Sequence, residues 1–490
     1  MTDPTAVISM IHEGAQQNSA TRLFRGEPVL AWTLRRLERS QRLAHMIVIC
    51  WEDQVADVEP ICGGHGANVL VKGPRAPIAS VEAVAAVRRW SDGWRGDLRG
   101  ACDFDLGFHA PWVREAIENL DADAAVLIDP SAALVDAAII DRLIERAATQ
   151  PEFELCFSHT PPGLGGAVVK MPLLKRLANA ELHPGHLLHS TTEQVGVVAC
   201  DGALPLPSSV TRAHGSFKLD SHRQIWRITN AMVVLNGSLI RSESEALVTR
   251  LGQEDYPDPL PRDIVLELTT ERFTRPLFAP GRPAGHTPRQ MTTEMALRLF
   301  KECAVLDDVR LTLAGSGDPM LAENAYEIIA AAIESGVDAI RIETDLLNVD
   351  SILAAQELAG AVDILAVHLP ACSEQAYEKV MGVNAYKKVL TNIERFHGEQ
   401  DVGDRGTPLL IPLFTPTPHN GREEKQWFER WPYGVSVAHS MAPAATRLIV
   451  LADGRIVSNA DAAGSPTATL GVLGQTPIAQ AWLNHPLQAA

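Results

Sequence analysis

The stretch IVLELTT at residues 264–270 is typical of a buried strand that ends in polar residues, and it opens the series that decides the fold. Further apolar runs of strand length follow it, and helical patterns separate them. The runs are residues 309–313, 339–342, 364–367 and 409–413, and the helical patterns are residues 293–302, 322–334, 349–359 and 385–396. Strands that alternate with helices predict a mostly parallel sheet covered by helices.

A second series of the same kind occupies the first 150 residues or so, with apolar runs at 5–11, 46–50 and 124–128. The sequence therefore predicts an α/β fold with two α/β units. Residues 241–262 are charged at first and then Pro-rich, which is typical of an interdomain connection. The tail after about residue 421 is rich in Gly, Ala and Ser and predicts a small appended domain. We expect domains at 1–240, 263–420 and 421–490, with a linker at 241–262.

The charge and the cysteines exclude several classes of protein. The 490 residues include 43 Lys and Arg against 60 Asp and Glu, so the net charge of −17 disfavours nucleic acid and anionic membranes as partners. No apolar run reaches the roughly 18 residues of a membrane-spanning helix. No Lys or Arg precedes Arg22, so the start lacks the charged region of a secretory signal, and we expect a cytoplasmic protein. The seven cysteines are scattered without any ligand-like spacing.

Residues 5–235 resemble the cytidylyltransferase-like sugar nucleotidyltransferases, which include proteins of spore-coat and surface-polysaccharide synthesis. The resemblance rests on the strand at 6–10, on GEPVLAWTL at 26–34, on the strand that ends in Cys50, and on LVDAAIIDRLI at 134–144. It implies a doubly wound domain of the nucleotide-diphospho-sugar-transferase type. In that family the loop after the first strand is rich in glycines and cations that bind a triphosphate. Here residues 12–22 hold one Gly and no cation before Arg22, which favours a surface loop, with Arg22 as the nucleotide-binding candidate.

The same family holds Mg²⁺ between two aspartates, because hard oxygen ligands suit this cation. The resemblance places the second aspartate at Asp220, within FKLDS at 217–221. The first position falls on Ser131, and Asp129 two residues upstream is the carboxylate that could replace it. A helix cap or a turn residue is the alternative interpretation of such an aspartate. Asp129 and Asp220 are thus the candidates for Mg²⁺ with a nucleotide.

The second half resembles the radical SAM superfamily in five ordered segments: residues 264–270, LTLAGSGDP at 311–319, IETDLL at 342–347, residues 364–368 with 377–386, and residues 389–396. The resemblance implies a partial (β/α)6 barrel. It also implies that Gly315, Gly317, Asp318 and Asp345 line the cleft that holds S-adenosylmethionine in that family. Ordinary turn chemistry is the alternative for the Gly-Asp-Pro sequence.

The family's radical chemistry needs a [4Fe–4S] cluster held by three cysteines in a Cys-x3-Cys-x2-Cys motif. Counted from Thr270, these positions are Arg272, Pro276 and Ala279, and none of these side chains can bind iron. Residues 448–484 resemble the SPASM extension, in which Ser458 and Asn459 stand where auxiliary-cluster cysteines are usual. We therefore expect a degenerate site without a [4Fe–4S] cluster.

Two functions are the main candidates, ahead of a structural homo-oligomer, and no catalytic residue is assigned. The leading hypothesis is a non-catalytic binding or assembly partner, acting beside an intact homologue in surface-polysaccharide or peptide modification. The alternative is an active Mg²⁺-dependent sugar cytidylyltransferase or glycosyltransferase in the N-terminal domain. The expected ligand is a nucleotide or nucleotide sugar, and we expect neither nucleic acid nor membrane insertion.

Overall fold

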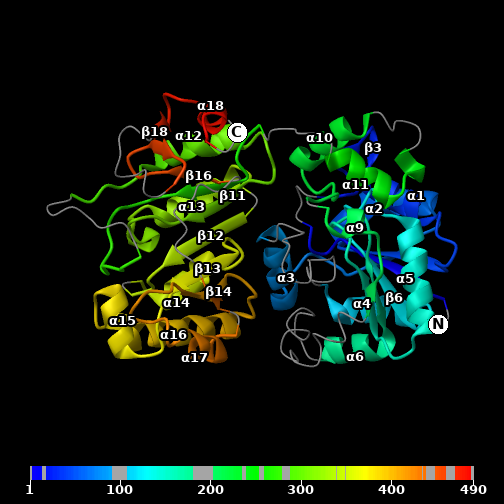
Figure 1. Cartoon of the computed structure of the whole chain (residues 1–490), viewed down its shortest axis with the longest axis horizontal. Coiled ribbons are helices and arrows are strands. Elements are labelled where there is room, and N and C mark those ends of the chain that lie inside the picture. Colours follow the sequence, from blue (N-terminus) through cyan, green and yellow to red (C-terminus); the bar gives the residue numbers. More distant parts are fainter. Residues whose placement is uncertain are drawn as a thin grey trace. The chain divides into compact units, whose positions relative to one another are not determined.

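The computed structural model divides the chain into two compact units, Met1–Tyr256 and Pro257–Ala490 (Figure 1). The residues that it describes are 3–13, 18–90, 108–179, 202–213, 215–233, 239–252, 259–278, 287–337, 339–347, 349–432, 434–436, 447–459 and 469–486. In this part of the chain, none of the helices has the length and apolarity that crossing a membrane requires.

The first unit is built on a seven-stranded sheet with the strand order β5-β4-β1-β6-β8-β7-β9. The strands β5, β4, β1 and β6 are parallel, and β8 runs antiparallel to β6 and β7. Their bounds are β1 Thr5–Ser9, β4 His45–Cys50, β5 Asn68–Val71, β6 Ala124–Ile128, β7 Leu155–Ser158, β8 Ala167–Lys170 and β9 Ala203–Leu204, beside the hairpin β2 Leu23–Phe24 and β3 Glu27–Pro28. The strand order reverses at β1 and β6, and ligands bind at such switch points in open α/β sheets.

Helices cover both faces of this sheet, because its strands bury alternate residues on opposite sides. Ala6 and Ile8 of β1 belong to one apolar core, whereas Val7 belongs to another. The first core receives residues of α1, α2 and α5, and the second receives residues of α3, α4 and α6. The helices of the unit are α1 Val29–Leu37, α2 Val55–Gly64, α3 Ala79–Trp90, α4 Ala110–Glu118, α5 Ala137–Thr149, α6 Met171–Asn179, α9 Ser208–Thr211, α10 His222–Ala231 and α11 Ser244–Gly252.

Helix α11 lies where the composition predicts a linker at 241–262. Leu247, Val248 and Leu251 have helical spacing, and all three are buried in the core that α11 shares with α10. Asp136 caps α5 by accepting a hydrogen bond from the backbone N–H of Ala138, and it also accepts bonds from the backbone and hydroxyl of Ser244. Part of the predicted linker is therefore a packed helix of the first unit, and the division between the two units falls after Tyr256, inside the predicted range.

The second unit is built on one nine-stranded sheet with the order β15-β14-β13-β12-β11-β10-β16-β17-β18. Neighbouring strands are parallel from β15 to β16, and β17 and β18 complete the sheet in antiparallel pairing. The bounds are β10 Asp263–Leu266, β11 Arg310–Leu313, β12 Ala339–Thr344, β13 Ile364–His368, β14 Leu409–Phe414, β15 Val435–Ser436, β16 Arg447–Val450, β17 Arg455–Val457 and β18 Thr469–Val472. Two parallel-rich sheets with helices confirm the predicted α/β class.

The described part of the second unit has seven α-helices, and all but α17 contribute buried residues to one large core on this sheet. They are α12 Thr293–Cys303, α13 Ala325–Glu334, α14 Ser351–Leu358, α15 Glu374–Met381, α16 Tyr386–Gly403, α17 Glu424–Arg430 and α18 Ile478–Leu483. Residues beyond 421 join the same core, because Leu448 and Val450 of β16 and Trp482 of α18 belong to it. A separate domain boundary near 421 stays a prediction.

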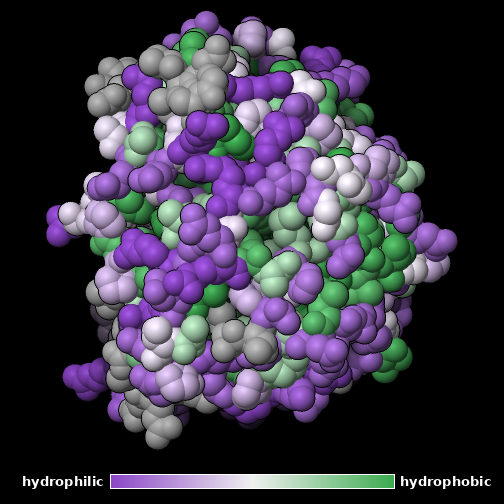
Figure 2. Space-filling model, turned by 90° about the vertical axis from the view of Figure 1, so that its right-hand side faces the viewer, coloured by the Kyte–Doolittle hydropathy of each residue, from purple (hydrophilic) through white to green (hydrophobic). Residues whose placement is uncertain are grey.

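The surface of the first unit is mixed in character. The face that Figure 2 shows is largely hydrophilic, with one apolar area towards one side. Exposed large apolar side chains in this unit include Leu23, Trp226 and Val233.

Candidate functional site

Asp129 lies at the switch point of the first sheet, directly after β6. Its carboxylate is buried and accepts hydrogen bonds from the backbone N–H of Ser131 (2.9 Å) and from the Ser131 hydroxyl (2.5 Å). The residue to which the resemblance assigns the first metal ligand is thus a hydrogen-bond donor to Asp129.

Two cationic side chains neutralise Asp129. Arg88 Nη1 lies 2.9 Å from Asp129 Oδ2, and Lys218 Nζ lies 3.0 Å from the same oxygen. Lys218 Nζ also lies 3.5 Å from Oδ2 of Asp220, whose side chain is 44% exposed. Burial alone would raise the pKa of Asp129, but Lys218 and then Arg88 lower it below its usual range. The two predicted metal ligands, Asp129 and Asp220, therefore both contact the ammonium group of Lys218.

Whether Mg²⁺ fits between Asp129 and Asp220 depends on the charged groups that already contact these two carboxylates. A divalent cation needs carboxylate oxygens within direct contact, yet Oδ2 of Asp129 already accepts two side-chain cations. An ammonium that contacts both carboxylates would repel a second cation placed between them. The residues as arranged do not fit Mg²⁺.

The loop after β1 contributes further buried polar groups. Glu13 accepts hydrogen bonds from the backbone N–H and hydroxyl of Ser19, and burial raises its pKa to about 7. The pKa of His12 is lowered well below its usual value, by burial first and then by the charges of Arg88 and His109. Arg22 is also buried, and its charge favours the ionised form of Glu13. Residues 14–17 of this loop lie outside the described residues.

Sequence reasoning missed His12, Arg88 and Lys218 as members of this site. Arg88 and Asp129 also line a small cavity of about 20 Å³, enough for one water molecule, together with Val7, Ser9, Phe108, Val113, Leu127 and Ile128. The available signal for Lys218 was its place beside Asp220 in FKLDS. Arg88 comes from α3, and nothing in the sequence brings it near β6.

The predicted cleft of the second unit contains an ion pair between Arg272 and Asp345. Arg272 Nε donates to Asp345 Oδ2 at 2.8 Å, and its Nη2 donates to the other carboxylate oxygen. Both side chains are at most 4% exposed, and the hydroxyl of Thr274 donates to the same carboxylate. Burial alone would raise the pKa of Asp345, but Arg272 holds it below its usual value.

Asp318 joins this ion pair through Asp345. Its Oδ2 accepts hydrogen bonds from the hydroxyl of Thr344 and from the backbone N–H of Asp345, both at 3.0 Å. Its Oδ1 accepts a bond from the backbone N–H of Met320 and so caps the short helix at Pro319–Leu321. Burial, followed by the Asp345 charge, raises the pKa of Asp318 to about 6. The cap is the turn chemistry that the sequence left open as an alternative role.

The two cleft glycines pack against the chain itself. A Cβ on Gly317 would lie 2.1 Å from the carbonyl oxygen of Thr269, and one on Gly315 would lie 2.6 Å from Cγ of Glu267. The Glu267 carboxylate accepts bonds from the backbone N–H and hydroxyl of Ser316 and from the backbone N–H of Ala452. Glu267, which sequence reasoning missed, thus ties this loop to the residues after β16. The sequence feature that could have indicated Glu267 is a carboxylate inside an apolar run.

The residues at the expected cluster positions do not fit a [4Fe–4S] cluster. Arg272 is held in its ion pair, Pro276 is buried, and Ala279 lies outside the described residues. The described part of the chain contains no group of three or more His, Cys, Asp or Glu side chains that could hold a metal ion. Near the ion pair, the buried Tyr377 hydroxyl and Nδ1 of His368 have no hydrogen-bond partner among the described residues.

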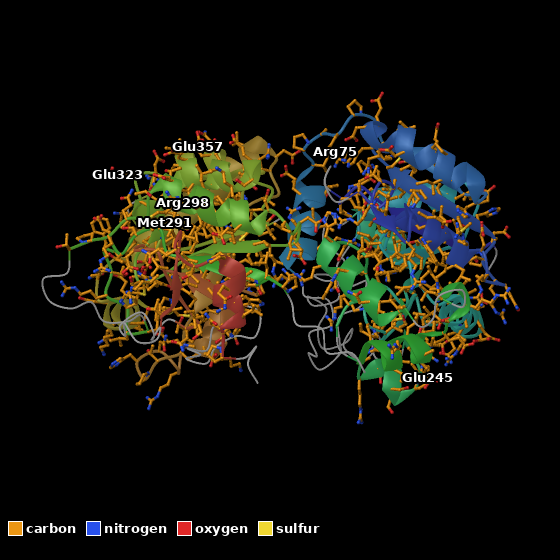
Figure 3. All side chains as sticks on the ribbon, turned by 90° about the horizontal axis from the view of Figure 1, so that it is seen from above. Arg75, Glu245, Met291, Arg298, Glu323 and Glu357 are labelled. Atoms are coloured by element: carbon orange, nitrogen blue, oxygen red, sulfur yellow. The ribbon has the colours of Figure 1, made fainter. Side chains whose placement is uncertain are left out.

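A separate groove of about 440 Å³ lies where α12 and α13 begin, lined by Gln290, Met291, Thr292, Thr293, Glu323, Asn324 and Glu327. Figure 3 labels two of these lining residues, Met291 and Glu323. Asn324 closes part of the groove by donating to the carbonyl of Met291 and to the hydroxyl of Thr293.

No curated protein matches the chain. A cytidylyltransferase from Leptospira borgpetersenii shares 14% identity, covering 52% of this chain and 94% of its own, with a TM-score of 0.38. SuiB of Streptococcus suis, bound to S-adenosylmethionine, shares 11% identity, covering 54% of this chain and 79% of its own, with a TM-score of 0.38. Residues 273–414 match the Radical SAM superfamily.

Proposed function

We propose that the chain is a cluster-free radical SAM/SPASM-like protein, fused to a nucleotidyltransferase-like domain, that acts as a non-catalytic binding or assembly partner. The observation that carries this proposal is the buried, bidentate ion pair between Arg272 and Asp345. Cluster formation needs thiolates, which are anionic sulfur ligands for iron. A guanidinium is a permanent cation without a free electron pair to donate, so it cannot take that role.

We propose binding rather than catalysis, because the candidate carboxylates of both sites are already held by other groups of the chain. Asp318 caps the short helix at Pro319–Leu321 and binds the end of β12, and Glu267 binds the loop at residues 315–317. The partner that we propose is an intact homologue in surface-polysaccharide or peptide modification in the cytoplasm. A nucleotide or nucleotide sugar is the proposed small ligand of the N-terminal unit.

The alternative, a Mg²⁺-dependent nucleotidyltransferase or glycosyltransferase, needs Asp129 and Asp220 on one metal ion. Their closeness favours it, since both carboxylates lie within 3.5 Å of Lys218 Nζ. We rank this alternative second because the Lys218 ammonium and Arg88 already supply the positive charge that a metal ion would bring to these carboxylates.

Iron analysis and product release test the leading proposal. Protein purified without oxygen and reconstituted with iron and sulfide should hold no cluster, and with a strong reductant it should release no 5′-deoxyadenosine from S-adenosylmethionine. Cys372, a partly exposed thiol, provides the control, because iron that disappears in Cys372→Ser is adventitious. Cluster-level iron with 5′-deoxyadenosine release would contradict the proposal.

A thermal-shift panel identifies the ligand. CTP, nucleotide sugars and S-adenosylmethionine are each added with and without Mg²⁺, and a ligand at a hundred times its dissociation constant should stabilise the protein by about 2.7 kcal/mol. Turnover of CTP with a sugar acid would make the N-terminal enzyme the better description.

A further inference from the structure

Lys218 is held firmly beside the two aspartates by its neighbours in the chain. Phe217 and Leu219 are fully buried in the core of the first unit, so Lys218 between them points to the other side. The backbone N–H of Phe217 donates to the carbonyl of Pro162 (2.8 Å), and that of Leu219 donates to the carbonyl of Ser131 (2.9 Å). The second bond links the Lys218 segment directly to the turn that positions Asp129.

A glycine lets another loop approach this segment closely. Gly163 has a φ of +88°, and a Cβ on it would lie 2.6 Å from the backbone nitrogen of Lys218. The Lys218 side chain is only 11% exposed, which is low for a lysine. A lysine that gives up most of its hydration needs anionic partners, and Asp129 and Asp220 supply two of them. The fold therefore holds Lys218 in a fixed position beside these two carboxylates.

The position of the ammonium is the one that a bridging divalent cation would need. It contacts Oδ2 of Asp129 at 3.0 Å and lies 3.5 Å from Oδ2 of Asp220. Both carboxylates are hard oxygen ligands of the kind that Mg²⁺ and Mn²⁺ prefer. Hence the carboxylates alone would suit a divalent cation, and the ammonium excludes it by contact and by charge.

We propose that Lys218 is a built-in cation that replaces a divalent metal ion between Asp129 and Asp220. The N-terminal unit then keeps its carboxylate pair neutralised without any metal. Removal of the ammonium alone converts the pair into a divalent-cation site. Asp129 retains its contact with Arg88 in that variant, so the buried carboxylate keeps one cationic partner and the protein keeps its fold.

Manganese titration of the full chain tests this proposal, with bound Mn²⁺ measured by the loss of the free-ion EPR signal. Wild-type protein should show only weak, unsaturable binding. Lys218→Met should gain one saturable site that binds Mn²⁺ at least tenfold more tightly. Lys218→Arg, which keeps the positive charge, should resemble the wild type, and Lys218→Met combined with Asp220→Asn should lose the gained site.

Lys387→Met is the matched control, because it removes a lysine from an exposed ion pair with Glu374 and changes the net charge equally. It should leave Mn²⁺ binding unchanged. Circular dichroism and the thermal midpoint verify that each variant is folded. Two results would overturn the proposal: tight Mn²⁺ binding by the wild type that Asp220→Asn abolishes, or a folded Lys218→Met protein that gains no site.

Discussion

Three charged side chains share a buried space in the second unit, and their charges do not balance. Arg272 supplies one positive charge, while Asp318 and Asp345 supply two carboxyl groups linked by the bond from the Asp345 backbone to Asp318. Two buried carboxylates this close cannot both ionise freely. The guanidinium keeps Asp345 charged, and Asp318 is therefore the group that retains a proton to higher pH.

This imbalance predicts a pH-dependent effect of Asp318→Asn. The pKa of Asp318 is raised to about 6, so between its unfolded value and pH 6 the folded protein binds more protons. Its contribution to stability therefore falls as the pH rises through that range and is constant above it. The variant lacks this loss, so its stability relative to the wild type should increase from about pH 4 to pH 7, by up to about 3 kcal/mol. Urea unfolding of both proteins measures this difference, and an equal difference at all pH values would contradict the prediction.

The sequence indicated these carboxylates but not their partners. Asp318 and Asp345 could be found because each follows an apolar run, where the carboxyl end of a strand is expected. Arg272 was found only as an unsuitable cluster residue, and its ion pair depends on residues 73 positions apart in the chain. Arg88 was missed because a helical pattern shows which face is apolar and not what its polar side chains meet.

At the scale of elements, the glycine loop after β11 is shaped by the strand-end segment that it contacts. A Cβ on Gly317 would lie 2.1 Å from the carbonyl oxygen of Thr269 and 2.7 Å from that of Glu271. The next residue, Asp318, donates its backbone N–H to the Glu271 carbonyl at 2.8 Å. A side chain at position 317 would separate these two segments and weaken that bond.

Gly317→Ala should therefore destabilise the protein, by about 1–3 kcal/mol as expected for overpacking. Gly398→Ala is the matched control, since Gly398 lies inside α16 with open space around it. Alanine is favoured over glycine in a helix, so this variant should be stabilised by about 0.5–1 kcal/mol. Thermal and urea unfolding measure both effects. Equal effects of the two substitutions would show that the contact at Gly317 is unimportant.

The length of α16 shows that the apolar repeat of the sequence does not determine where a helix ends. The apolar pattern predicts a helix at 385–396, but α16 continues to Gly403, because residues 397–403, which carry no apolar repeat, extend a helix that is already formed. It ends at Asp404, which adopts the left-handed conformation typical of a helix C-terminus. The strands β11, β12, β13 and β14, by contrast, were predicted within two residues, since each is a short apolar run.

At the scale of the whole molecule, each unit has its own sheet and its own apolar cores. The strand order of the second unit could not be predicted, because β16 pairs with β10 although more than 180 residues separate Leu266 from Val450. Its partner on the other side is β17, so β16 is an interior strand of the sheet. The tail is consequently a structural part of this unit.

This placement predicts how fragments behave. Residues 1–256 and residues 257–490, expressed separately, should each unfold cooperatively, because the cores of the two units contain no common residue. A fragment of residues 257–446 should lose cooperative unfolding, since it lacks β16 and the buried Trp482 and exposes the β10 edge. Circular dichroism during heating distinguishes these outcomes. A 257–446 fragment that unfolds at the same midpoint as 257–490 would mean that the tail is an appendage with no part in the core.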